Sequence, residues 1–359
     1  MIFLYICRHF DNRASMQINR RLSIDLAHAN VLMTILIVAM HTSWDGEPRL
    51  NTLNVLTNIA VPTFFCISSF LYFYNWQPTW QCYVAKIRSR VYSLLIPYLA
   101  YNILFYIYYI VKIHLLHLTT TKHIPTDLLG AIGCILSGEP DGVMWYVRDL
   151  MVFVVVIAPL LGLLLRHSGW WIMPLLATGS VCCLLPYYNI LFWIPCLSLG
   201  AWTALYLPSI AERTSTLRRQ LDGNRWAGTV VLLVLVCVTM YLADVSRRSE
   251  VFYAFRMVAP LFIVLLCLTF DRHMPVACTQ RLAPLCFFVY CTHTAFVDIA
   301  KARLLPLLQG ISLDYRLTYA VMLVAVLCSV MLAALFVRRY LPPIWTILSG
   351  HRKERTFTD

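Results

Sequence analysis

His41 is the residue of this chain whose type and position best suit catalysis. It lies near the end of an apolar stretch, after residues 37–40, where ionisable side chains are costly and therefore rare. Imidazole takes up a proton near neutral pH, which is the task of a general base when a hydroxyl attacks a carbonyl. The alternative is a histidine at a helix end that a carbonyl or interfacial water satisfies. Spacing alone leaves both interpretations open.

Two polar residues bracket His41. Asn30 precedes it by eleven positions, and on a helix that offset places both side chains on one face about 16 Å apart. One long ligand would therefore contact both. Asp45 follows His41 by four positions and is a candidate for orienting the imidazole if the helix continues that far. Gly46 and Pro48 come directly after Asp45 and argue against such a continuation.

Three cations, Lys86, Arg88 and Arg90, lie close together before the third apolar stretch. Such cations can hold the phosphates of a nucleotide-like donor. Cations that only anchor a membrane protein on its cytoplasmic side give the same pattern, and composition alone favours that plainer interpretation.

Trp145, Arg148 and Asp149 form a mixed group at the start of the fourth apolar stretch. We expect the charges to anchor an acceptor sugar and the indole to stack on its apolar face. An interfacial aromatic belt is an equal alternative for Trp145. Because neighbouring helical residues point about 100° apart, Arg148 and Asp149 are not expected to pair with each other. For His293 and Asp298 we expect structural polar contacts.

The elements that must position these residues are membrane-spanning helices. Of the 359 residues, 60% are hydrophobic and 13% are charged, whereas soluble domains are roughly 45–50% apolar and 25% charged. Apolar stretches of about 20 residues recur along the chain, and only helices satisfy the backbone in such stretches. We therefore predict an all-α polytopic membrane bundle of ten spans. The predicted spans are 24–43, 53–74, 91–111, 143–165, 170–186, 189–207, 227–243, 251–270, 284–300 and 317–340.

The distribution of Lys and Arg predicts the orientation of the bundle. If the N-terminus is cytoplasmic, most of these cations fall in inner loops, as the positive-inside rule requires. Both termini are then cytoplasmic. The predicted division is a cytoplasmic N-terminal segment, 1–23, a membrane domain, 24–340, and a basic cytoplasmic tail, 341–359. The long outer loop, 112–142, contains a short apolar piece that we expect in the membrane interface.

Composition also argues against other classes of protein. The net charge of +12 comes from cations scattered through short loops, so we expect no nucleic-acid partner. The 13 cysteines mostly stand singly in apolar runs, without a CxxC spacing. We therefore expect small buried thiols, no disulfide framework and no metal site.

Five motifs in order resemble the membrane-bound acyltransferase family 3, the integral-membrane O-acyltransferases of bacterial surface polysaccharides. They lie in residues 24–41, 61–71, 88–98, 144–150 and 287–293. The resemblance implies ten helices in a bacterial inner or plasma membrane, surrounded by lipid, and a donor such as acetyl-CoA that binds from the cytoplasm. It also implies that His41 is the catalytic residue and that no cofactor is bound permanently. We assign Lys86, Arg88, Arg90 and Asn30 to the donor.

The chain departs from the family pattern at two positions. Asn30 stands where the family usually has Arg or Lys, and Ser69 stands where it usually has Gly. We expect an O-acyltransferase that moves an acyl group, such as acetyl, from acyl-CoA to a surface or exopolysaccharide or its lipid-linked precursor. A transporter or flippase that uses Arg148, Arg256 and Asp298 is one alternative, although we find no internal repeat. A degenerate member that binds without catalysing is the other.

Overall fold

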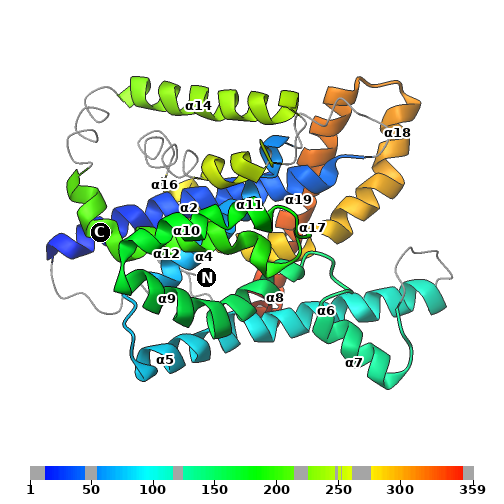
Figure 1. Ribbon diagram of the computed structural model, residues 1–359. Helices are drawn as coiled ribbons and strands as arrows, with labels where there is room; N and C mark the ends of the chain where they lie inside the picture. Colours follow the sequence, from blue (N-terminus) through cyan, green and yellow to red (C-terminus); the bar gives the residue numbers. More distant parts are fainter. Residues whose placement is uncertain are drawn as a thin grey trace.

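The chain is helical throughout the part that the structure describes. The computed structural model describes residues 13–44, 55–115, 124–213, 225–246, 250–251, 253–260 and 276–350, and within these ranges it contains no strand. Most of the long helices run side by side along one direction (Figure 1). The all-α prediction is therefore confirmed.

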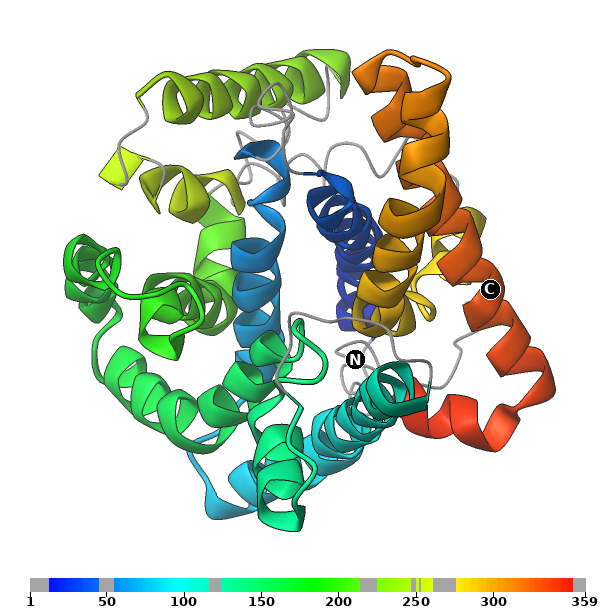
Figure 2. The same ribbon diagram turned by 90° about the vertical axis from the view of Figure 1, so that its right-hand side faces the viewer.

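Helix α2 (Arg13–Thr42) lies inside the bundle. In the view along the bundle, the other helices surround α2 and its neighbour α4 (Ala60–Phe73) (Figure 2). Met33 and Ile37 of α2 are almost fully buried in the main hydrophobic cluster. The apolar part of α2, Leu26–Thr42, needs protein or lipid around it to be stable. Helix α2 begins at Arg13, within the segment that we expected to precede the first span.

The helix α4 packs closely against α12 (Ile194–Arg213). Gly200 of α12 lies directly against the backbone of α4, and a Cβ atom there would come within 2.9 Å of the Phe70 nitrogen. Ser69 is fully buried, and its hydroxyl donates to the Leu197 carbonyl at 2.5 Å. Small residues at such contacts let two backbones approach. Ser69 thus adds a hydrogen bond at this contact.

Several helices are long and apolar enough to cross a membrane. Four qualify in the described residues: Val55–Phe73, Trp80–His114, Trp145–His167 and Tyr315–Tyr340. A fifth span would combine Val276–Leu282 with Cys286–Gly310, which are bent by 61°. Shorter apolar helices coincide with other predicted spans, and the predicted span 251–270 extends beyond the described residues after residue 260. The membrane character is supported, while the count of ten and the orientation remain predictions.

The third predicted span is part of a longer helical segment. The α5 helix (Trp80–Arg90) continues through a π-helical turn, η2 (Val91–Leu95), into α6 (Ile96–Ile110) and a second π-helical turn, η3 (Val111–Leu115). Pro97 in the first turn of α6 lacks an amide proton, which accounts for the altered hydrogen bonding just before it. The cations of α5 are therefore joined to the membrane helix without a loop.

The fourth span consists of α8 (Trp145–Val152), the π-helical turn η4 (Phe153–Ile157) and α9 (Ala158–His167). The α17 helix (Cys286–Ile299) follows α16 (Val276–Leu282) and leads through η7 (Ala300–Leu304) into α18 (Leu305–Gly310). The last long helix is α19 (Tyr315–Tyr340). Together with α2 and α4, the α8 and α17 helices supply the residues of the candidate site.

Seven further helices complete the list of those named. They are α7 (Leu128–Ser137), η5 (Gly169–Trp171), α10 (Ile172–Ala177), α11 (Gly179–Cys182), η6 (Ile190–Trp193), α14 (Arg225–Ser246) and α20 (Pro342–Leu348). The α7 helix corresponds to the apolar piece of the long loop. The α20 helix lies in the predicted tail and is docked, because Trp345 packs on Phe288 and the Tyr101 hydroxyl donates to the Leu348 carbonyl. Residues 351–359 lie outside the described residues.

Candidate active site

A cavity lies between α2, α4, α8 and α17, beside η2. Its empty volume is about 710 Å³, part of which is open to the outside. Five polar side chains line it: Asn30, Thr34, Ser68, Tyr146 and Tyr290. The apolar lining residues are Leu26, Phe64, Ile67, Leu71, Leu94, Val147, Leu150, Cys286 and Phe287. A mostly apolar cavity with a few polar groups is the usual form of a small-molecule site.

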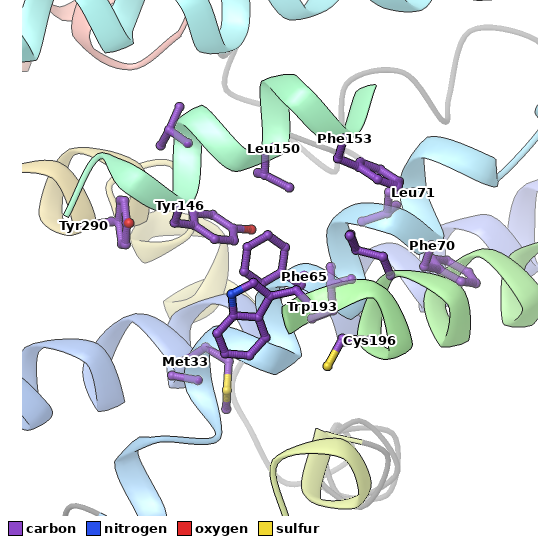
Figure 3. Packing of buried hydrophobic residues seen from close by; sticks show 14 of the residues in the cluster. Met33, Phe65, Phe70, Leu71, Tyr146, Leu150, Phe153, Trp193, Cys196 and Tyr290 are labelled. Carbon is purple, nitrogen blue, oxygen red and sulfur yellow. The ribbon is translucent and has the colours of Figure 1, made fainter. Parts of the chain in front are cut away.

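Two tyrosines and a serine close one part of this cavity. The hydroxyls of Ser68 and Tyr146 are 2.9 Å apart, which joins α4 to α8. The Tyr290 hydroxyl donates to the Val143 carbonyl just before α8. The rings of Tyr146 and Tyr290 meet edge to face with centroids 5.8 Å apart, and Figure 3 shows the two side chains next to each other. The lining is therefore tied together by hydroxyl groups from three helices.

His41 and His293 form a pair of imidazoles. Their ring centroids are 5.0 Å apart with an interplanar angle of 57°. His293 is fully buried, and its Nδ1 lies 2.7 Å from the Tyr290 carbonyl and 3.2 Å from the Val289 carbonyl. Since carbonyl oxygens only accept, Nδ1 carries the proton. The buried Nε2 then has a lone pair, and it has no hydrogen-bond partner in the described residues.

The imidazole pair lies next to the cavity rather than in its lining. His41 is half-buried and is not among the lining residues. Tyr290 precedes His293 by about one helical turn, and their ring centroids are 6.3 Å apart. Tyr290 therefore contacts both the cavity and the imidazole pair. On the other side, the Tyr319 hydroxyl of α19 donates to the Ala39 carbonyl at 2.8 Å and holds the end of α2.

The predicted donor-binding residues lie in different surroundings. Asn30 lines the cavity. Lys86 is buried, its amine donates to the Tyr72 carbonyl at the end of α4, and it lies 4.8 Å from the centre of the Tyr72 ring. A cation at a helix C-terminus also interacts favourably with the helix dipole. Arg88 is exposed and Arg90 is half-buried. Their role in donor binding remains a prediction.

Arg148 and Asp149 pair with each other, so the expectation that they would not is wrong. Arg148 donates from Nε and Nη2 to Asp149 Oδ1 at 3.2 and 3.1 Å. The Asp149 side chain is almost fully buried, and an isolated buried carboxylate is costly. The long arginine side chain bends back to supply a partner despite the angular offset. Arg148 also donates to the carbonyls of Ser137 and Tyr188.

Two other predicted features have different outcomes. Asp45 lies outside the described residues. His293, for which we expected a structural contact, is the direct neighbour of His41. Sequence reasoning missed this pairing, although residues 287–293 form one of the motifs. In the part of the chain that the structure describes, no three His, Cys, Asp or Glu side chains are placed to hold a metal ion together.

Comparison with known proteins gives one match. A family model described as "Acyltransferase domain" matches residues 28–338. No curated protein and no solved structure matches the chain. The matched range includes all the cavity-lining residues except Leu26, and it includes both imidazoles and the aromatic residues around them.

Proposed function

This chain belongs to acyltransferase family 3, and from that premise we propose that it moves an acyl group, such as acetyl, from acyl-CoA to a hydroxyl of a surface or exopolysaccharide or its lipid-linked precursor. The observation that carries the proposal is the pair of His41 and His293, one helical turn beyond a mostly apolar cavity. Proton transfer by a positioned imidazole is the chemistry that acyl transfer to a hydroxyl requires. The cavity and the imidazole pair are two adjacent places in the bundle, which suits a reaction whose two substrates approach separately.

His41 acts as the general base in this proposal. It takes the proton of the acceptor hydroxyl as the oxygen attacks the thioester carbonyl. The tetrahedral intermediate then collapses, the carbon–sulfur bond breaks, and the imidazolium returns its proton to the departing thiolate. His293 is a positioning residue, because its Nε2 lone pair lies in a buried place beside His41 and can accept a hydrogen bond from that ring.

The cavity is the proposed place of the thioester arm. Leu94 lines it, and Arg90 precedes Leu94 by about one turn on the same helical segment. Phosphates held by Arg88 and Arg90 would therefore lie close to the cavity. Asn30 contributes an amide to the same lining. The acceptor is proposed to approach from the other side, past Trp145, Arg148 and Asp149.

The test is the replacement His41→Ala in the full chain, purified in lipid nanodiscs. Thiol release from acetyl-CoA is measured with alkali-treated envelope glycan, which has lost its O-acyl groups. The expected loss of turnover is roughly 10²–10⁴-fold, with an unchanged thermal midpoint, because general base catalysis contributes about that much. His167→Ala is the matched control, since His167 is an exposed histidine at the end of α9. Full activity of His41→Ala would exclude His41 as the base.

A binding-only member of the family is the second candidate, and Asn30 is the observation that favours it. The cavity carries an amide where the family usually carries a cation. A binding-only protein would release no thiol in the wild-type form, even with an acceptor that binds. The same assay therefore separates the two candidates.

A further inference from the structure

Two adjacent tyrosines project from the turn between α11 and η6. Tyr187 and Tyr188 are each 55% exposed, and their rings lie 5.5 Å apart at an angle of 73°. Trp145 at the start of α8 meets the Tyr187 ring edge to face with centroids 5.6 Å apart. Trp145 itself is half-buried. Three aromatic side chains from two distant segments therefore form one surface.

Buried contacts hold this surface in place. Trp193 is almost fully buried and stacks between Phe65 and Trp145, with centroids 5.0 and 6.2 Å away and angles of 21° and 24°. Figure 3 shows Phe65 and Trp193 packed together in the core. The Trp193 indole nitrogen donates to the Tyr187 carbonyl at 2.7 Å. Arg148 donates to the Tyr188 carbonyl at 3.3 Å, so side chains from both sides fix the backbone of the turn.

Contacts between rings connect this surface to the imidazole pair. Trp145 meets Tyr146 at 6.4 Å, and Tyr146 meets Tyr290 at 5.8 Å. Tyr290 meets His293 at 6.3 Å, and His293 meets His41 at 5.0 Å. Each step is a direct neighbour contact. The exposed rings and the imidazole pair therefore belong to one continuous set of packed rings.

We propose that Trp145, Tyr187 and Tyr188 form a stacking platform for a glycan acceptor. The apolar C–H face of a sugar ring matches an exposed aromatic face, and the amphipathic phenol and indole rings keep polar edges for its hydroxyls. Because buried stacking and backbone hydrogen bonds already order the platform, a glycan would lose little free energy in fixing it. The Arg148 side chain is 37% exposed beside it, and one N–H group of Nη1 remains for a sugar oxygen after its four bonds to protein oxygens. This inference rests on the proposed function and identifies where its acceptor binds.

Calorimetric titration of the full-length His41→Ala protein tests the platform without turnover. The probe is alkali-treated envelope glycan of the native host, added to protein in nanodiscs. Replacement of both Tyr187 and Tyr188 by Ala is expected to weaken glycan binding roughly tenfold or more, about the change in Kd for the loss of 1.4 kcal/mol. Replacement of both by Phe keeps the rings and is expected to retain most of the affinity. Trp170→Ala, at a tryptophan that is 82% exposed, is the control for a general effect of surface aromatics.

In the protein with His41 intact, the double Ala replacement is expected to raise the acceptor KM and leave the acetyl-CoA KM unchanged. Glycan affinity that is unchanged in the double Ala variant, or lowered equally by Trp170→Ala, would overturn the platform. The absence of glycan binding to the His41→Ala protein with both tyrosines intact would also overturn the platform. If the glycan binds and depends on the tyrosines while no thiol is released, the platform stands and the proposed acyl transfer fails. If acyl transfer occurs and neither glycan affinity nor the acceptor KM depends on the tyrosines, the proposed acyl transfer stands and the platform fails.

Discussion

At the scale of single residues, the site depends on two imidazoles with different surroundings. His41 could be recognised in the sequence, because an ionisable side chain near the end of an apolar stretch is rare. Its partner could not, because α2 and α17 are remote in sequence and only their packing brings the rings within 5.0 Å. The pairing of Arg148 with Asp149 was also missed, because helix geometry predicts the direction of Cβ atoms but not how a long side chain bends toward a buried carboxylate.

If His293 positions His41, the replacement His293→Asn should lower kcat without changing the KM values or the thermal midpoint. The asparagine amide can still donate to the Tyr290 carbonyl in place of Nδ1, but it lacks a group at the position of Nε2. We expect kcat to fall by roughly 10²-fold, because small misplacement of a catalytic group costs about that much. Both KM values and the thermal midpoint should stay close to those of the wild type. A purely structural role would instead lower the thermal midpoint and leave kcat of the folded fraction unchanged.

At the scale of elements, the contact between α4 and α12 determines the position of Ser68. Small residues such as Ser68 and Ser69 permit a close helix contact. The sequence alone does not indicate the partner helix, because any apolar helix with a small residue would fit. The structure identifies Gly200 and the Leu197 carbonyl as the partners. The same packing directs Ser68 to the Tyr146 hydroxyl on the cavity side.

Gly200→Ala is expected to destabilise this contact. The added methyl group would overlap the Cys66 carbonyl and crowd the Phe70 nitrogen, and both are backbone atoms that cannot turn away. We expect a loss of about 1–3 kcal/mol in the free energy of unfolding, as for other overpacked sites. The thermal midpoint in detergent measures it. Gly133→Ala is the matched control, because no atom lies within 4 Å of its added methyl group. Equal midpoints for the two variants would show that α4 and α12 can separate without cost.

At the scale of the whole molecule, the sequence predicted the helical membrane bundle correctly. Composition and the lengths of apolar stretches decide that much, because a bilayer permits few architectures. Boundaries were less predictable. The α5 helix runs without a loop into the third span, although its sequence is polar enough to suggest a surface segment, and α20, which we placed in the tail, folds back onto Phe288. Tertiary packing, rather than hydropathy, fixes these ends.

The predicted orientation can be tested with single cysteines at two exposed positions, Gln81→Cys and Gln309→Cys. The exposed native cysteines Cys237, Cys278 and Cys328 are first replaced by serine. With both termini cytoplasmic, a membrane-impermeant maleimide should label position 309 in intact cells and position 81 only after permeabilisation, because cations gather on the inner side. The opposite labelling pattern would reverse the topology. Labelling of both positions in intact cells would exclude an odd number of spans between them.

The hydroxyl bridge between Ser68 and Tyr146, together with the tether from Tyr290 to Val143, has a consequence for the cell. An enzyme whose donor and acceptor come from opposite sides of a bilayer risks becoming a leak for protons and small ions. Under the proposed function, the tethered rings of Tyr146 and Tyr290 line the end of the cavity that faces the imidazoles, and they narrow the path that water and ions could take through the bundle. An acyl group could then pass from one compartment to the other while the membrane keeps its voltage.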